Sequence, residues 1–203
     1  MKLLFIESLK KQNLDLKLNL SFKQVHILYS IQYKKTAELI KKQLESNSVK
    51  IHGFSQVLGC SSIKSDFPLL LIGSGKFHAQ SIAFSSKKPV FIFENNTIKK
   101  ISQEEIKDYE KKLKAKYSKF LFSDNIGVIF STKSGQSQIK NSNKIKKQLE
   151  KQFPEKHFYS FVSDNINLQE LENFPDIEFF VNTSCPGLEF DNKKIINYKN
   201  IKK

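Results

Sequence analysis

Short, continuous apolar runs recur along the chain and are separated by longer segments in which apolar residues return at helical spacing. Such short runs are typical of strands buried on both faces, as in a parallel sheet. The predicted strands cover residues 2–7, 25–29, 49–51, 68–72, 89–93, 127–131, 157–162, 177–181 and 195–196.

The segments between these strands predict helices. Their ranges are 33–45, 77–85, 102–120 and 137–153, with a helical turn at 168–171. In the first of them Ala37, Ile40 and Leu44 fall on one face and lysines on the other, the pattern of an amphipathic helix. The long third helix opens with Ser102, and Glu105 follows three positions later, which predicts a capping box.

Strand and helix alternate throughout, which predicts an α/β fold with parallel sheets and right-handed crossovers. A chain of 203 residues accommodates one large or two small domains. We expect two Rossmann-like parallel-sheet domains, at residues 23–120 and 121–203, preceded by a strand and a linker in residues 1–22.

Charge changes this picture little. All the basic residues are lysines, and the formal net charge is +14. A basic surface favours acidic or nucleic-acid-bearing partners, but these lysines are scattered and no Lys/aromatic recognition motif occurs. We therefore prefer biased composition as the cause and expect no direct nucleic-acid contact. Because Arg is absent, any bidentate clamp on a carboxylate must come from other residues or another chain.

Compartment is inferred from apolar runs and cysteines. No apolar run approaches the roughly 20 residues that a membrane span needs, and we interpret residues 1–11 as structure rather than a signal peptide. The two cysteines, Cys60 and Cys185, do not make a disulfide framework. We expect a cytoplasmic protein in a reducing environment, without membrane association.

Candidate chemistry is densest between Gln56 and His78. The predicted strand at 68–72 ends in Gly73-Ser74-Gly75 and leads into a helix, an arrangement that gathers backbone N–H groups around an anionic ligand. The same three residues also suit an ordinary tight turn. Cys60, just upstream, suits either a functional thiol or a small buried hydrophobe.

The metal-binding potential of the two thiols is incomplete. Two thiolates complete neither a four-ligand zinc site nor a standard iron–sulfur cluster. Histidines could add ligands, but only His78 lies in a motif. His26, His52 and His157 fall in or beside predicted strands, where we expect structural roles.

Five short motifs follow one another along nearly the whole chain. They are VLGC ending at Cys60, IGSGKFH ending at His78, KPVFIFE, TKSGQ ending at Gln136, and VNTSCPG around Cys185. In this order they resemble the diphthamide synthase family, which makes 2-(3-amino-3-carboxypropyl)histidine on translation elongation factor 2. The resemblance is closest to the archaeal form.

This resemblance implies three similar α/β domains, each giving one cysteine to a single [4Fe–4S] cluster whose fourth iron is left for S-adenosylmethionine. Cys60 matches the cysteine of the central domain and Cys185 that of the C-terminal domain. Nothing matches the cysteine of the N-terminal domain, and residues 3–7 look like its last strand. The resemblance thus implies a chain that lacks most of that domain.

The other positions carried over from the family are implied to shape the cavity for S-adenosylmethionine and the cluster. They are Gln56, Gly73, Ser74, Gly75, His78 and Gln136. Gly187 stands where the family usually has Arg, a departure that removes a polar contact and bears on activity.

The resemblance implies radical transfer of the 3-amino-3-carboxypropyl group from S-adenosylmethionine to a histidine of elongation factor 2. We expect two domains of a split enzyme in a dimeric assembly, completed by a separate polypeptide that brings the third cysteine. One alternative is a non-catalytic supporting subunit, although both cysteines stand in intact motifs. Another is a small Lys-rich nucleic-acid-binding α/β protein.

Overall fold

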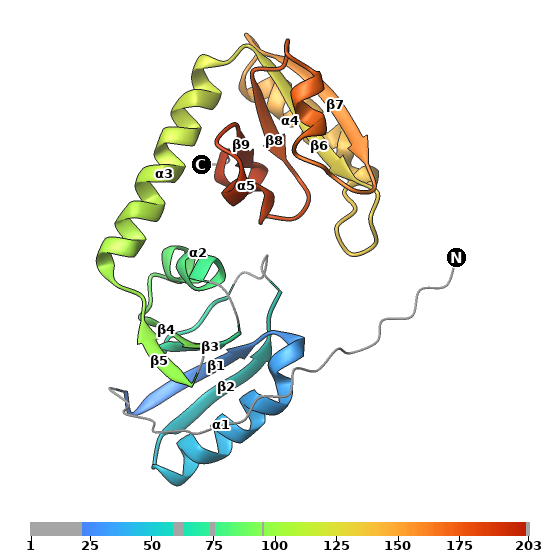
Figure 1. Ribbon diagram of the computed structural model, residues 1–203. Coiled ribbons are helices and arrows are strands. Elements are labelled where there is room, and N and C mark those ends of the chain that lie inside the picture. Colours follow the sequence, from blue (N-terminus) through green and yellow to red (C-terminus); the bar gives the residue numbers. More distant parts are fainter. Residues whose placement is uncertain (1–21, 59–62, 74–75, 95, 202–203) are drawn as a thin grey trace. The chain divides into compact units, whose positions relative to one another are not determined.

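The structure, a computed structural model, describes residues 22–58, 63–73, 76–94 and 96–201 (Figure 1). It divides into two compact units, Met1–Tyr109 (unit 1) and Glu110–Lys203 (unit 2). The predicted strand at 2–7 lies outside the described residues. In the part of the chain that is described, no helix is long and apolar enough to cross a membrane.

Unit 1 contains a five-stranded sheet in the order β2-β1-β3-β4-β5. Strands β1 to β4 are parallel, and β5 runs antiparallel to β4. The strands are β1 (Gln24–Tyr29), β2 (Lys50–Gln56), β3 (Leu69–Ile72), β4 (Val90–Glu94) and β5 (Thr97–Lys100). The helices are η1 (Ile31–Tyr33), α1 (Lys34–Ser46), α2 (Lys76–Ser86) and the start of α3 (Gln103–Phe122).

Strand β3 explains why its sequence is apolar without interruption. Leu70 and Ile72 pack into the core beneath α1, whereas Leu69 and Leu71 pack into the core beneath α2. The two helices lie on opposite faces of the sheet (Figure 1). All four side chains are buried, as expected for a parallel strand covered on both faces.

Unit 2 contains a four-stranded sheet in the order β7-β6-β8-β9, and every pair of neighbours is parallel. The strands are β6 (Asn125–Ser131), β7 (His157–Ser163), β8 (Phe179–Asn182) and β9 (Ile195–Asn197). The helices are η2 (Ile139–Asn141), α4 (Ser142–Gln152), η3 (Glu170–Asn173), α5 (Leu188–Asp191) and α6 (Tyr198–Ile201). The α/β class with parallel sheets is thereby confirmed.

Helix α3 contributes to both cores. Its N-terminus has the predicted capping box: Ser102 N–H donates to Glu105 Oε2 at 2.8 Å, and Glu105 N–H donates to Ser102 Oγ at 3.1 Å. Tyr109 packs edge-on against Phe84 of unit 1, with ring centroids 5.3 Å apart. Phe120 is fully buried in the core of unit 2. The division between the compact units therefore falls inside this helix.

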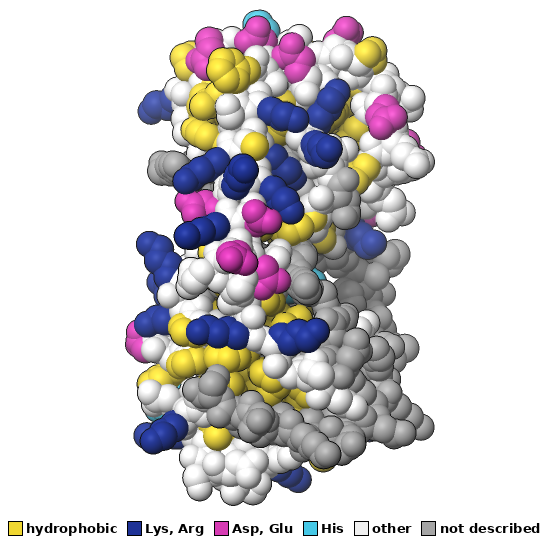
Figure 2. Space-filling view, turned by 60° about the vertical axis from the view of Figure 1, so that its left-hand side comes forward, with side chains coloured by type: hydrophobic (Ala, Val, Ile, Leu, Met, Phe, Trp, Pro, Cys, Tyr) yellow, Lys and Arg dark blue, Asp and Glu magenta, His cyan; other side chains and the backbone are white. Residues whose placement is uncertain are grey.

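Lys156 closes the C-terminal end of α3. Its buried ammonium donates to the carbonyls of Leu121 at 2.8 Å and Ser123 at 2.7 Å, and it lies 5.7 Å from the ring centroid of Phe120. Carbonyls at a helix C-terminus lack partners within the helix and favour a cation. Elsewhere lysines are dispersed over the face shown in Figure 2, with acidic side chains between them.

Several element boundaries differ from the prediction. Strand β2 continues to Gln56, where a loop was expected, and α4 begins at Ser142 rather than near residue 137. Strand β5 was not predicted, because its sequence, Thr-Ile-Lys-Lys, is polar. Lysines are common on exposed edge strands, where they discourage pairing with other chains.

Candidate functional site at the carboxyl edges of the two sheets

The two sheets share one topology. In each, the chain forms a central strand, adds the second strand on one side, and then crosses to add the third and fourth on the other side. The third strand is thus β3 in unit 1 and β8 in unit 2. Ligands of open α/β sheets bind beyond the carboxyl ends of the strands where the order reverses. These points lie between β1 and β3 and between β6 and β8.

Cys185 lies at this switch point of unit 2. It follows the carboxyl end of β8 and precedes α5, and its thiol is half-buried and in no disulfide. The N–H of Leu188 donates to the Cys185 carbonyl at 3.2 Å, which closes the turn around Pro186. A Cβ added to Gly187 would lie 3.5 Å from Cys185 Sγ, in van der Waals contact. The glycine therefore leaves one side of the sulfur without a side-chain neighbour at this position.

Buried polar side chains hold the loop that carries Cys185. Asn182 Nδ2 donates to the Cys185 carbonyl at 2.8 Å, and Asn182 Oδ1 accepts the Ser184 N–H at 2.9 Å. Asn197 Nδ2 donates to the Pro186 carbonyl at 3.1 Å. The backbone around the thiol is thus fixed by groups that do not touch the sulfur.

The TKSGQ turn leaves the neighbouring strand β6 at the same edge. The Lys133 N–H donates to Ser131 Oγ at 3.0 Å, and the Gln136 N–H donates to the Lys133 carbonyl at 3.0 Å. Gly135 has φ of +81°, a conformation that favours glycine. Gln136 is exposed. Since β6 and β8 are adjacent and parallel, the structure brings the Gln136 and Cys185 loops to one edge.

In unit 1, Gln56 and Gly73 both lie at the carboxyl edge. Gln56 is the exposed last residue of β2, and Gly73 follows β3, with strand β1 between them. A Cβ at Gly73 would lie 3.4 Å from Ser30 Oγ, in ordinary van der Waals contact with the loop after β1. His78 is half-buried in the first turn of α2. Cys60, Ser74 and Gly75 lie outside the described residues.

The structural roles expected for two histidines are confirmed. His26 Nε2 lies 3.0 Å from Ser55 Oγ, and burial lowers the pKa of His26 from its ordinary value of 6.5. His52 stacks on Phe67, with ring centroids 3.4 Å apart, and lies 3.2 Å from Gln24 Oε1. His157 is exposed in β7.

In the described part of the chain, Cys185 offers one thiolate, the kind of ligand that an iron–sulfur cluster takes. Among the described residues, no group of three or more His, Cys, Asp or Glu side chains could hold a metal ion. Cys185 is instead a single, partly accessible thiol on a fixed loop. The expectation that Cys60 and Cys185 bind one cluster stays a prediction.

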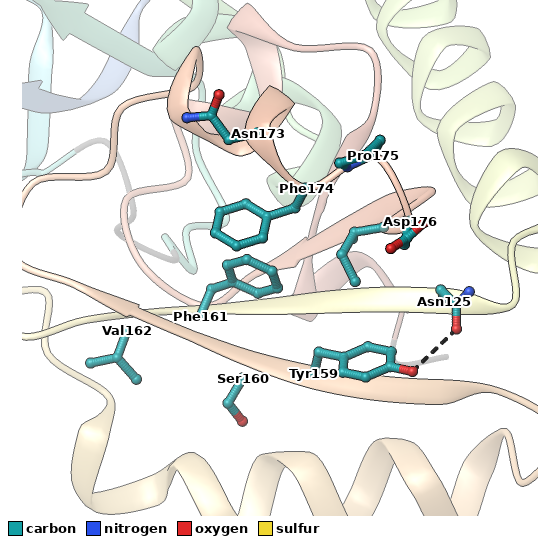
Figure 3. A pocket seen from close by; sticks show the side chains of 10 residues that line it. Asn125, Tyr159, Ser160, Phe161, Val162, Asn173, Phe174, Pro175 and Asp176 are labelled. Carbon is teal, nitrogen blue, oxygen red and sulfur yellow. Dashed lines mark hydrogen bonds between the residues drawn. The ribbon is translucent and has the colours of Figure 1, made fainter.

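A groove in unit 2 flanks the edge strand β7 and holds about 590 Å³ (Figure 3). Among its lining residues, Phe161 and Phe174 pack edge to face, with ring centroids 4.8 Å apart, and Tyr159 Oη donates a long hydrogen bond to Asn125 Oδ1 at 3.5 Å. None of the predicted site residues lines this groove.

No motif in the sequence identified Asn182, Asn197 and Glu189 as site residues. Each stands next to a short apolar run, where a polar residue that ends up buried requires partners. That signal alone does not identify the partners, because the three residues come together only when β8 and β9 pair.

Comparisons with known proteins agree with this geometry. Residues 4–199 match the family described as diphthamide synthesis protein. The chain is 32% identical over 174 residues to the 2-(3-amino-3-carboxypropyl)histidine synthase of Methanocaldococcus jannaschii, covering 83% of this chain and 46% of that protein. It is 31% identical over 140 residues to the synthase of the same name from Pyrococcus horikoshii, covering 67% of this chain and 40% of that protein.

Solved structures agree as well. The crystal structure of Dph2 from Pyrococcus horikoshii matches with a TM-score of 0.76 and 25% identity, over 88% of this chain and 56% of that one. The structure of the same protein with a 4Fe-4S cluster matches with a TM-score of 0.75, 26% identity and the same coverage. The chain spans about half the length of the curated relatives that it matches. A match over nearly every residue settles the family, and the chain belongs to the diphthamide synthesis proteins.

Proposed function

We propose that this chain supplies two α/β domains of a 2-(3-amino-3-carboxypropyl)histidine synthase, the enzyme of the first step of diphthamide biosynthesis. The observation that carries the proposal is the position of Cys185. A half-buried thiol on a fixed loop at the switch point of a parallel sheet belongs to a chain whose relatives bear this enzyme name. A structural relative binds a 4Fe-4S cluster, which is the group that such thiols hold.

In this proposal Cys60 and Cys185 bind a [4Fe–4S] cluster as thiolates, and a domain outside these 203 residues provides a third cysteine. When bound, the reduced cluster would supply one electron for cleavage of the Cγ–S bond of S-adenosylmethionine, with 5′-methylthioadenosine as the leaving group. The 3-amino-3-carboxypropyl radical would add to C2 of the target imidazole, and loss of one electron, returned to the cluster, and of the C2 proton would complete the transfer. The target is a histidine of translation elongation factor 2.

The chain's own residues would orient the cofactor and the substrate. Gly73, Ser74, Gly75 and the start of α2 would offer backbone N–H groups to the carboxylate of S-adenosylmethionine. The absence of Arg makes such groups the natural carboxylate partners. Gln56, His78 and Gln136 would line the same cavity.

The loop that carries Cys185 would already have its final conformation when the thiolate binds the cluster. The hydrogen bonds to its carbonyl remain compatible with metal binding because they leave Sγ unused. The open side next to Gly187 leaves room beside the sulfur. The Arg that the family usually has at this position would fill that room, so we expect the charge it brings to come from elsewhere in the assembly.

The proposed partners follow from the third cysteine ligand of the cluster, which these 203 residues do not contain. The enzyme would assemble from this chain and a polypeptide that carries the third cysteine, in a dimeric assembly, with elongation factor 2 as its protein substrate. The proposal involves no membrane and no direct nucleic-acid contact, and places the reaction in the cytoplasm.

The test is anaerobic cluster reconstitution of the chain, alone and together with the cysteine-bearing N-terminal domain of a relative. We expect the complex to hold iron, to show a broad charge-transfer absorption band, to cleave S-adenosylmethionine after reduction and to modify elongation factor 2. Cys60→Ala and Cys185→Ala should each remove most of the iron and all of the transfer.

Two results would contradict the proposal. A complex that modifies the factor equally well after both cysteine replacements would identify the chain as a non-catalytic supporting subunit. An isolated chain that binds a full cluster and acts unaided would show that no other domain is needed, and that a ligand such as His78 replaces the third cysteine.

A further inference from the structure

The loop around Cys185 rests on three polar side chains that the core of unit 2 has enclosed. Asn182, Asn197 and Glu189 are only 2%, 4% and 3% exposed. Burying amide and carboxylate groups is unfavourable unless each is hydrogen-bonded. All three are bonded, and their bonds form one continuous chain that ends at the cysteine.

The cysteine end of this chain is Asn182. Its amide bridges the Ser184 N–H and the Cys185 carbonyl, at 2.9 and 2.8 Å, so it holds both sides of the peptide segment that carries the thiol. The same Nδ2 donates to Asn197 Oδ1 at 2.6 Å. Asn182 and Asn197 are directly opposite each other in the parallel pairing of β8 and β9.

The other end is Glu189, in α5. Its Oε1 accepts the Asn197 backbone N–H at 2.9 Å, and its Oε2 accepts Asn197 Nδ2 at 2.8 Å. Asn200 Nδ2 donates to both carboxylate oxygens, at 3.0 and 3.1 Å. Lys116 of α3 also donates to the backbone carbonyl of Glu189.

The carboxylate and the backbone groups of the loop together fix the direction of every bond in this chain. An ionised carboxylate only accepts hydrogen bonds, so Asn197 must turn Nδ2 toward Glu189 and Oδ1 toward Asn182. Asn182 must then turn Nδ2 toward Asn197 and the Cys185 carbonyl, which leaves Oδ1 for the Ser184 N–H. A neutral amide at position 189 would place an NH₂ group where one carboxylate oxygen now accepts, so it would face the donors of Asn197 and Asn200 and lose the bonds that this oxygen makes.

We propose that Glu189 is a positioning residue for Cys185, acting through Asn197 and Asn182 to hold the thiol in its ligand conformation before any metal binds. The inference rests on the proposed function in one respect: that function identifies an iron–sulfur cluster as the group that the thiol binds. Partners one step removed from a metal site orient its ligands, and their loss typically weakens metal binding by about 10- to 100-fold. An all-apolar core could supply stability alone, whereas an ordered polar chain adds a defined loop conformation.

The test uses the full chain with Cys60→Ala, in which Cys185 is the only thiol. The rate of maleimide labelling is measured well below the unfolding temperature, with and without Glu189→Gln. We expect Glu189→Gln to change the labelling rate of Cys185 several-fold, because the loop then samples other conformations. Asn182→Ser, which is too short to bridge the same groups, should do the same and serves if Glu189→Gln does not fold.

Glu178→Gln is the matched control. Glu178 Oε2 accepts the backbone N–H groups of Asp124 and Asn125 at the amino end of β6, so this change weakens the same unit without touching the Cys185 loop. The proposal is overturned if all three variants lower the unfolding midpoint while labelling stays within about twofold of the parent. Such a result would assign the network to stability alone.

A second readout separates this proposal from the proposed function. With Cys60 restored and the cluster reconstituted in the complex, Glu189→Gln should release iron to a chelator about 10- to 100-fold faster than Glu178→Gln. If labelling responds but the parent complex never holds iron, the positioning role stands and the proposed function fails. If iron is held and neither readout responds to Glu189→Gln, the positioning role is wrong and the proposed function stands.

Discussion

The two sheets of this protein have the same strand order, but the two cysteines follow different strands along the sequence. Cys185 follows β8, the third strand of its sheet, and is held by side chains from β8, β9 and α5. In the sequence, Cys60 follows β2, the second strand, whereas the third strand β3 leads into Gly73. Because the two sheets share one topology, their loops gather at the carboxyl edge in each. The side chains that contact a loop then determine which functional group it can hold in place.

A second contrast concerns the aromatic side chains that pack on a glycine in each sheet. Each sheet contains a glycine over which an aromatic ring lies: His26 over Gly53 in unit 1, and Phe180 over Gly127 in unit 2. The first ring is half-buried and polar, whereas the second is buried among other phenylalanines. The core of unit 2 should therefore tolerate change less well than that of unit 1.

The largest effect should come from the aromatic core of unit 2. Phe120 is 0% exposed and lies 5.0 Å, centroid to centroid, from Phe153, so Phe120→Ala should lower the free energy of unfolding by about 3–5 kcal/mol. Phe122, two residues along the same helix, is 87% exposed, and Phe122→Ala should change stability by no more than about 0.5 kcal/mol. Urea unfolding followed by circular dichroism measures both, and equal effects would contradict the assignment of α3 to this core.

The paired glycines provide an intermediate effect. A Cβ at Gly127 would lie 2.5 Å from the ring of Phe180 and 3.0 Å from that of Phe161, so Gly127→Ala should destabilise by about 1–3 kcal/mol. A Cβ at Gly53 would lie 2.5 Å from His26, whose half-buried ring can rotate away at the loss of its bond to Ser55. Gly53→Ala should therefore lie at the low end of that range, about 1 kcal/mol. The same unfolding experiment ranks them, and a larger loss at Gly53 would reverse the comparison.

The smallest effect is a pH dependence confined to unit 1. Burial lowers the pKa of His26, so the unfolded chain binds a proton at a higher pH than the folded chain does. The stability of unit 1 should be full above pH 6.5 and should fall as the pH drops from 6.5 toward the lowered pKa. His26→Gln should remove this part of the pH dependence, as seen in thermal unfolding between pH 7.5 and about 5. A profile unchanged by this substitution would assign the acid sensitivity to other groups.

Local patterns predicted much of the fold. The apolar run at β3 identified a strand buried on both faces, and the Ser102–Glu105 spacing identified the N-terminus of α3. Strand β5 was missed because its pairing depends on a turn at Asn96, which has φ of +59°, and not on apolar residues of its own. An element is predictable from local sequence when its own pattern of apolar residues stabilises it.

The candidate site was predictable only in part, for a related reason. The motifs around Cys185, Gly73 and Gln136 stand at strand ends, and the structure places each described one at a carboxyl edge. Asn182 and Asn197 looked like ordinary loop residues, because only the register between β8 and β9 sets them opposite each other. Side chains that meet through sheet pairing leave no spacing signal in the sequence.

Helix α3 has a consequence for the order in which the chain folds during synthesis. The last residues that it gives to unit 1, Ile106 and Tyr109, are made before any residue of unit 2. Unit 1 can therefore complete its core while the rest of the helix is still in the ribosome, in keeping with N-terminal domains folding first. Once Leu113, Tyr117 and Phe120 emerge, the helix presents a ready apolar surface on which the strands of unit 2 can assemble.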